Sequence, residues 1–217
     1  MGKFVVLGLG SFGFYIAKTL YENGQEVVAI DSEESIIEKI KDYASQAFVA
    51  DATDKETLSA MGVTDADAVI VGLGPRMEPS ILAVLYLREL GVKEIIVKAL
   101  NEDHKKILEV LGATEVIYPE KDIAVRTAHK IMSGNVIDFL PLAPGYSIQQ
   151  IAPPPYFIGK SLRELDLRNK YKIQVIAVKE IIPEKLHLIP AGDFVIKESD
   201  LLMVVGRDED IKKLSSS

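Results

Sequence analysis

Short apolar runs alternate with longer amphipathic stretches along the first 118 residues of the chain. Continuous β-branched runs are typical of strands buried on both faces, and apolar positions three or four residues apart indicate helices. The predicted strands are residues 3–7, 26–30, 47–50, 68–71, 94–98 and 115–117. The predicted helices are residues 12–23, 33–42, 55–61, 77–90 and 103–111. This alternation predicts an α/β fold, a Rossmann-like doubly wound parallel sheet with helices on both faces.

The pattern changes after Tyr118. Pro119 is suited to open a helix, which we expect to end near Ser133, and seven of the ten prolines lie from Pro141 onward. Later strands are predicted at residues 146–151, 172–179, 186–189 and 201–205, with a short helix at 162–165. We therefore expect two domains: residues 1–135, and a second, smaller α+β C-terminal lobe of residues 142–217.

Composition narrows the classes of function. The chain of 217 residues has no cysteine and a net charge of −7, and 22 of its 32 acidic residues lie before Pro141. Disulfides and thiolate metal sites are excluded, and without a basic surface we expect no nucleic-acid partner. Neither an apolar run of membrane-spanning length nor an apolar leader after Met1 is present, so we expect a cytoplasmic protein.

The first predicted strand leads directly into the sequence GLGSFG, which fits the spacing G-x-G-x-x-G. Gly8 suits the tight turn, Gly10 lets a phosphate approach the backbone, and Gly13 lets the helix pack against the strand. The start of that helix, at Ser11 and Phe12, offers backbone N–H groups and a partial positive charge. The motif predicts a nucleotide site; a glycine-rich turn without a ligand is the alternative.

The ends of later strands supply further candidates. Asp31 follows the second strand about twenty residues beyond the motif, where an acidic side chain accepts the ribose hydroxyls and disfavours the 2′-phosphate of NADP. The structural alternative is that Asp31 only precedes a helix capped by Ser32. Asp51 ends the third strand beside Ala52, where it can meet the adenine. Gly72 ends the fourth strand in the sequence Gly-Leu-Gly, as a ligand contact or as part of a plain loop.

Two charged residues lie where phosphates could be reached. Lys98 ends the fifth strand, and Glu120 lies in the first turn of the helix after Pro119. A solvated lysine and an acid favoured by the helix dipole are the structural alternatives. Thr53 and Glu56 fit a capping box for the third helix, which explains both without a ligand.

No set of residues for proton transfer accompanies the nucleotide motif. Tyr156 and Lys160 have the spacing Tyr-x-x-x-Lys, but three prolines and Gly159 make a helix there implausible. Gly-x-Ser-x-Gly and Walker sequences are missing as well. We therefore expect a nucleotide-sensing protein that is not an enzyme. A small NAD-dependent oxidoreductase is the alternative, and a nucleic-acid-binding redox repressor is weaker because no basic helix-turn-helix is present.

Motifs over nearly the whole chain resemble those of a known family. The N-terminal motifs are VVLGLGSFG, VVAID, VADATD, ADAVIVGLG, IIVKALN and HKKILEVLGATEVIYPEKD. The C-terminal motifs are IGKSLRELDLRNKY and IQVIAVKE. These segments resemble the RCK, or KTN, regulatory subunits, TrkA-type and KtrA-like, of Ktr and Trk potassium transport systems and potassium channels.

The resemblance implies an RCK_N nucleotide-binding domain with a crossover helix in residues 1–135 and an RCK_C regulatory lobe in residues 142–217. It implies a homo-oligomer whose dimers assemble into a ring on a membrane potassium-translocating subunit of Ktr/Trk type. Adenine nucleotide would change the ring's conformation and so gate that subunit. Family ligands are ATP and ADP in the Ktr branch and NAD or NADH in the Trk branch.

By position in the family motifs, Asp31 would hold the ribose, Asp51 the adenine side and Lys98 the phosphate side. Glu120 would hold a divalent cation, Mg²⁺ or Ca²⁺, next to the phosphates. One position departs from the pattern: many Ktr-type subunits have arginine where this chain has Ser11. The loss of that charged contact, about 1.5 to 3 kcal/mol, weakens the expected discrimination between ATP and ADP.

Some relatives bind cyclic di-AMP in the C-terminal lobe, between two subunits. The resemblance makes Arg168 and Pro190 candidates for this second effector site. Gln174 corresponds to a position that is histidine in some relatives.

Overall fold

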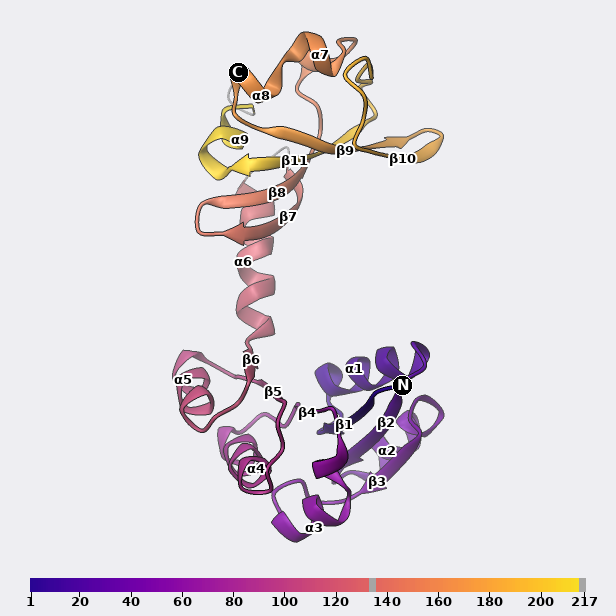
Figure 1. The fold of residues 1–217 in the computed structure, drawn as a ribbon, viewed down its shortest axis with the longest axis vertical. Helices are drawn as coiled ribbons and strands as arrows, with labels where there is room; N and C mark the ends of the chain where they lie inside the picture. Colours follow the sequence, from indigo (N-terminus) through magenta and orange to yellow (C-terminus); the bar gives the residue numbers. More distant parts are fainter. Residues whose placement is uncertain (133–135, 215–217) are drawn as a thin grey trace. The chain divides into compact units, whose positions relative to one another are not determined.

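The computed structural model describes residues 1–132 and 136–214 and forms two compact units, Met1–Pro119 and Glu120–Ser217 (Figure 1). We call them the first and the second unit. Each has its own sheet and its own apolar core. The predicted helix end at Ser133 and the predicted domain end at residue 135 lie outside the described residues.

The first unit contains a six-stranded parallel sheet in the order β3-β2-β1-β4-β5-β6. Its strands are β1 (Lys3–Leu7), β2 (Glu26–Asp31), β3 (Gln46–Val49), β4 (Ala68–Val71), β5 (Ile95–Lys98) and β6 (Glu115–Ile117). The strand order reverses between β1 and β4, which makes the sheet doubly wound and confirms the predicted fold class.

Helices connect these strands, as the sequence predicts. They are α1 (Ser11–Glu22), α2 (Glu34–Ile40), α3 (Lys55–Ala60), α4 (Met77–Glu89) and α5 (Glu102–Val110), with 3-10 turns η1 (Lys41–Tyr43) and η2 (Val63–Asp65). The predicted capping box at Thr53 and Glu56 is wrong. Asp54 caps α3, because its carboxylate accepts the Thr57 N–H at 2.9 Å. The Thr53 hydroxyl instead donates to Asp51, at 2.7 Å.

Ser32 does not cap α2 either. Glu33 is the residue before the helix, and its side chain makes no capping hydrogen bond. Asp31 accepts the Glu33 N–H instead, at 2.9 Å. This bond forms a turn just before the helix, and the first turn of α2 has no side-chain cap.

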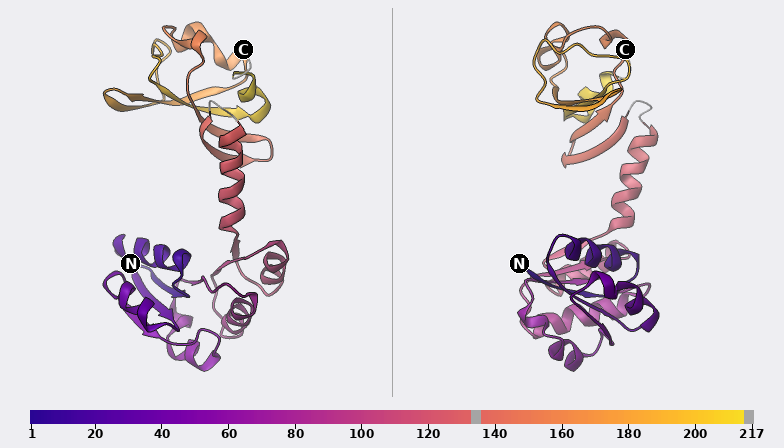
Figure 2. Two further views of the ribbon diagram at one scale, coloured as in Figure 1. Left: turned by 180° about the vertical axis from the view of Figure 1, so that it is seen from behind. Right: turned by 90° about the vertical axis from the view of Figure 1, so that its right-hand side faces the viewer.

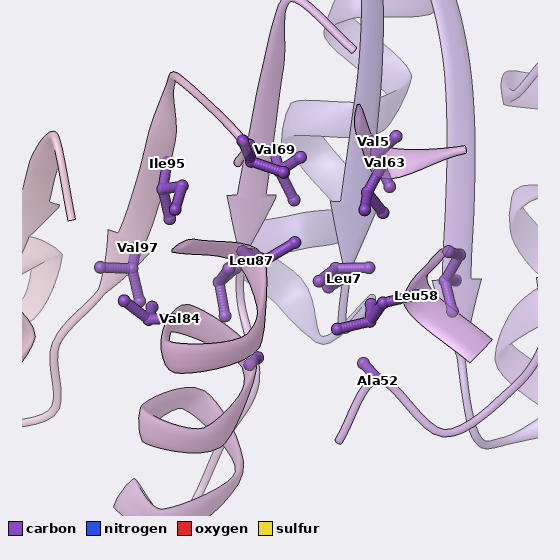
Figure 3. Packing of buried hydrophobic residues seen from close by; sticks show 14 of the residues in the cluster. Val5, Leu7, Ala52, Leu58, Val63, Val69, Val84, Leu87, Ile95 and Val97 are labelled. Atoms are coloured by element: carbon purple, nitrogen blue, oxygen red, sulfur yellow. The ribbon is translucent and has the colours of Figure 1, made fainter. Parts of the chain in front are cut away.

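Successive residues of β1 face two different apolar cores. Val5 and Leu7 are fully buried and pack with Leu58 of α3 and Leu87 of α4 (Figure 3). Val6 points to the opposite face, where it joins a core formed with α1 and α2. Because helices cover both faces, β4 is buried along its whole length. The carboxyl ends of the strands are thereby held in one rigid edge.

The second unit contains a five-stranded antiparallel sheet in the order β10-β9-β11-β8-β7. Its strands are β7 (Val136–Ala143), β8 (Tyr146–Ile151), β9 (Gln174–Ile181), β10 (Glu184–Leu188) and β11 (Leu201–Arg207). Its helices are α6 (Pro119–Met132), η3 (Pro155–Phe157), α7 (Leu162–Leu165), α8 (Leu167–Lys170) and α9 (Asp208–Leu214). The hairpin of β9 and β10 projects from one end of the sheet (Figure 2). The separate α+β lobe is thus confirmed.

Several elements of this unit differ from expectation. Strand β7 is not predicted, because Pro141 interrupts its pattern; the strand tolerates proline because it lies at the edge of the sheet. Strand β9 begins two residues later than predicted, after Lys172, whose φ of +58° leaves the extended region. The short helices α8 and α9 are not predicted.

The compact units of the structure have other bounds than the predicted functional domains. The stretch between the two predicted domains, residues 136–141, lies within β7, which pairs with β8. The compact units instead separate after Pro119. The functional domains of residues 1–135 and 142–217 stay a prediction.

Candidate functional site

The glycine motif lies at the carboxyl end of β1 and is packed too closely to carry side chains at two of its positions. Gly8 has a φ of +82°, and its N–H donates to Ile30 O at 2.8 Å. A Cβ atom built on Gly13 would lie 1.9 Å from Gly8 O. The first turn of α1 therefore rests directly on the backbone of the loop.

Gly10 has different surroundings. A Cβ atom on Gly10 would find no other atom within 4 Å, and the φ of −57° does not itself require glycine. Gly10 caps α1 without a side-chain hydrogen bond, and no acidic residue lies in the first turn. Ser11 is exposed beside it, whereas Phe12 packs partly into the core. The loop leaves open space next to a helix start whose N–H groups favour an anion.

Asp31 holds the loop in place from the end of β2. Its Oδ2 accepts the Leu9 N–H at 2.7 Å, and its Oδ1 accepts the Glu33 N–H at 2.9 Å. Each carboxylate oxygen can accept a further hydrogen bond, so the side chain can still receive ribose hydroxyls. The hydrogen bond from the Leu9 N–H to Asp31 was not evident from the sequence, because it depends on the path of the glycine loop.

The residues that follow β3 and β4 are closely packed at the carboxyl edge of the sheet. Asp51 Oδ1 accepts the Thr53 N–H at 2.8 Å, while the side chain of Ala52 is buried among core residues (Figure 3). Only the backbone of Ala52 is then available to a ligand. A Cβ atom on Gly72 would lie 2.9 Å from Gly8 O, so Gly72 also serves close packing of the two loops.

Lys98 and Glu120 lie on elements other than those that carry the motif. Lys98 is the last residue of β5, and β4 lies between β5 and β1. Strand spacing puts the end of β5 about 10 Å from the end of β1, farther than a lysine side chain extends, so a phosphate that Lys98 contacts would lie between the two strand ends. Glu120 is exposed and is the first residue of the second unit. Its part in the site stays a prediction.

A buried histidine ties two loops at this edge. The Leu100 N–H donates to His104 Nδ1 at 3.2 Å, so His104 Nε2 carries the proton and donates to Ser80 Oγ at 3.1 Å. The Ser80 hydroxyl in turn donates to Met77 O at 2.9 Å. His104 and Ser80 are fully buried, and this burial lowers the pKa of His104. The β4–α4 and β5–α5 loops are thus joined by a neutral imidazole.

The second unit brings its three candidates to one place. Arg168, Gln174 and Pro190 all line an open pocket of about 320 Å³. Arg163 and Gly192 lie in the same lining. Two guanidinium groups and an amide outnumber the one carboxylate of the lining, Asp166, and suit an anionic ligand with hydrogen-bonding groups.

Two features are absent from the described residues. No helix among them is long and apolar enough to cross a membrane. Within the described ranges, no three histidine or carboxylate side chains are grouped so that they could hold a metal ion.

Comparison with known proteins places the chain in a family. The TrkA-N domain family matches residues 4–119, and the TrkA-C domain family matches residues 150–217. Ktr system potassium uptake protein C of Bacillus subtilis (strain 168) is 40% identical over 211 residues, 97% of this chain and 95% of that protein. The chain belongs to the TrkA-domain family of Ktr potassium uptake proteins. The resemblance seen in the sequence motifs is confirmed.

Two further relatives extend the match. Ktr system potassium uptake protein A of Bacillus subtilis is 36% identical, covering 99% of this chain and 96% of the relative. The protein of the same name from Vibrio alginolyticus is 35% identical, covering 99% and 97%. The similarity therefore includes both units.

Solved structures share the fold. The GsuK RCK domain has a TM-score of 0.70 at 19% identity and covers 100% of this chain and 48% of its own. The GsuK channel bound to NAD has a TM-score of 0.70 at 18% identity, covering 100% and 40%. The Shewanella denitrificans Kef CTD in AMP-bound form has a TM-score of 0.52 at 20% identity, covering 61% and 82%. This chain spans about half the GsuK RCK chain.

Proposed function

We propose that this protein is a cytosolic regulatory subunit of a potassium uptake transporter or channel, which senses an adenine nucleotide in its first unit. The support from comparison is the 40% identity to a Ktr system potassium uptake protein over nearly the whole chain. The nucleotide acts as a signal, and it can shift the assembly between two shapes only by binding one of them more tightly.

The observation that carries the nucleotide site is the open space at Gly10. Neighbouring backbone occupies the space that a side chain on Gly8, Gly13 or Gly72 would need. Gly10, in contrast, has free space beside it at the start of α1, which no side chain caps. A phosphate placed there would accept helix N–H groups and meet the positive end of the helix dipole.

The ligand is an adenine nucleotide with free ribose hydroxyls, such as ATP, ADP or NAD(H). Asp31 favours ribose hydroxyls and repels a 2′-phosphate. GsuK structures are described as bound to NAD and to ADP, and the Kef structure as bound to AMP. These three molecules share an adenosine and its first phosphate, the part that Asp31, Asp51 and Gly10 are placed to hold. Ser11 adds no charge that would select a third phosphate.

Selection among phosphate tails falls to Lys98 and Glu120. Lys98 would attract the phosphates, while the carboxylate of Glu120 would repel a bare tail and favour one that carries Mg²⁺ or Ca²⁺. A single carboxylate can take part in such a site because phosphates and waters supply the other ligands. The cation would then report which nucleotide is bound.

Exposed apolar side chains on α6 and β7 support a homo-oligomer. Ile123 and Ile131 on α6 are 63% and 76% exposed, and Leu140 and Leu142 on β7 are 52% and 55% exposed. Apolar groups of this number on neighbouring elements favour burial against a second copy. Dimers would assemble into a ring that acts on a membrane potassium-translocating subunit of Ktr/Trk type.

The pocket of Arg168, Gln174 and Pro190 would be a second effector site, and cyclic di-AMP suits its chemistry. The two arginines can meet phosphates, and Pro190 offers an apolar surface to a base. We call this pocket the effector pocket.

Two measurements test the proposal. Native mass spectrometry of the purified protein should show a retained adenine nucleotide in the first unit. Co-expression with a Ktr membrane subunit in cells without other potassium uptake should restore uptake. A protein that retains no nucleotide and has no effect on uptake would contradict it, and turnover of NADH would favour the oxidoreductase alternative instead.

A further inference from the structure

A single carboxylate in the second unit touches both ends of one loop. Glu180 lies near the end of β9 and is only 8% exposed. Its Oε2 lies 2.6 Å from Nε2 of His187 in β10, and its Oε1 accepts a hydrogen bond from Lys197 Nζ. His187 precedes and Lys197 follows residues 189–196, which we call the wall segment. Glu180 therefore closes this segment at its base.

The two ends of the wall segment are fixed by other bonds as well. At the first end, the Ile189 N–H donates to Ile176 O at 2.9 Å, and the His187 ring packs edge-on against Phe194 with centroids 5.0 Å apart. At the second end, buried Asp200 accepts the Lys197 N–H at 2.8 Å. Each end is held locally, and Glu180 connects the two.

The wall segment forms one side of the effector pocket. Pro190 and Gly192 line the pocket, whereas Glu180 does not. Gly192 O also accepts the Arg163 N–H, at 2.7 Å, so the position of the segment sets that of a pocket arginine. A shift at the base of the segment would therefore change the spacing between Pro190 and Arg168 across the pocket.

We propose that Glu180 is a positioning residue for the effector pocket, holding the wall segment so that Pro190 and Gly192 face Arg168 at a fixed spacing. The inference rests on the proposed function of that pocket as an effector site. Its specific content is that ligand affinity depends on a carboxylate that does not touch the ligand.

The charge state of Glu180 fits this role. Hydrogen bonds from Lys197 and His187 lower its pKa to about 2, so the side chain is a carboxylate throughout the physiological range. Lys197 and His187 are the side chains that face it, and Asp200 accepts the Lys197 N–H. The tie between the two ends therefore persists at any pH at which the protein would meet its ligand.

The test compares Glu180→Gln with Glu184→Gln in the full-length protein. Glu184 is a matched control, since it lies on the same hairpin and pairs with Lys179 at 2.7 Å but touches neither end of the wall segment. In Glu180→Gln we expect about tenfold faster hydrogen exchange at the amides of Ile189 and Ile196. About tenfold is the smallest change expected when a hydrogen bond to a charged group is lost. We expect calorimetry to show cyclic di-AMP binding about tenfold more weakly. The control should match wild type in both.

The outcomes separate this inference from the proposed function. Unchanged exchange in the wall segment of Glu180→Gln overturns the inference, and so does faster exchange that extends through β11, because the role would then be global stability. If wild type does not bind cyclic di-AMP but Glu180→Gln loosens the segment alone, the ligand assignment fails and the positioning role stands. Should Glu180→Gln not fold, Lys197→Gln frees one end, and unchanged exchange at Ile196 would then overturn the inference.

Discussion

Replacing Gly10 by alanine separates ligand binding from folding. The backbone at Gly10, φ −57° and ψ −177°, is open to alanine, and its Cβ would meet no atom within 4 Å. Folding should therefore not suffer, and the stiffer unfolded chain should add about 0.4 to 1 kcal/mol of stability. The new methyl group would instead occupy the space where a phosphate approaches the start of α1.

The expected loss of affinity follows from that displacement. Moving the phosphate away by about one carbon–carbon bond, ~1.5 Å, breaks at least one hydrogen bond to a helix N–H. A hydrogen bond to a charged group contributes about 1.5 to 3 kcal/mol, which corresponds to about 10- to 150-fold weaker binding. Gly10→Ala should therefore bind ADP that much more weakly while unfolding at or slightly above the wild-type temperature.

Gly13→Ala is the matched control with the opposite pattern. Its Cβ would lie 1.9 Å from Gly8 O, so the backbone itself must move. We expect a loss of about 1 to 3 kcal/mol in the free energy of unfolding. Calorimetry with ADP and thermal unfolding on nucleotide-free protein measure both effects. Wild-type affinity for ADP, ATP and NAD in Gly10→Ala would refute the reasoning that places a phosphate at this loop.

Three further predictions concern titratable residues. Asp31→Ala should weaken adenine nucleotides by about 1 to 3 kcal/mol in calorimetry, and unchanged affinity would remove Asp31 from the site. Glu120→Gln should abolish the strengthening of ATP binding by Mg²⁺ or Ca²⁺; equal cation dependence in both proteins would exclude its role. Burial lowers the pKa of His104 in the folded protein below 6.5. The contribution of neutral His104 to the free energy of unfolding should therefore be complete above pH 6.5 and be lost as the pH falls to the pKa of the folded state. His104→Gln should flatten this dependence of the unfolding temperature between pH 8 and pH 5, and an unchanged slope would contradict it.

Much of the first unit could be predicted because local and long-range signals agree there. Buried β-branched runs indicate the strands. The glycine motif is recognisable because close backbone packing, such as that of Gly13 on Gly8, excludes side chains. The cap of α3 could not be assigned, because Thr53 and Asp54 both suit the position and only the path of the chain selects Asp54. The neutral His104 left no sequence signal, since its partner Ser80 lies on another helix, α4.

The second unit was harder to predict because its strands pair over long distances. Proline is found in strands mainly at the edge of a sheet, so Pro141 indicates a loop when the strand order is unknown. The sequence does not reveal that β7 is an edge strand, because this depends on the order of the folded sheet. The contacts of Glu180 with His187 and Lys197 depend on the register of β9 and β10. In contrast, Arg168, Gln174 and Pro190 were named from motif positions alone; the fold places them around one pocket, and their role there stays a prediction.

We propose that a bound nucleotide changes the shape of the assembly while the fold stays the same. Small-angle scattering of the purified, nucleotide-free protein, with saturating ATP plus Mg²⁺ and then with ADP, tests it most directly. We predict different scattering curves for the two ligands, with unchanged circular dichroism in the far ultraviolet. Identical scattering for ATP and ADP, when calorimetry shows that both are bound, would contradict the account.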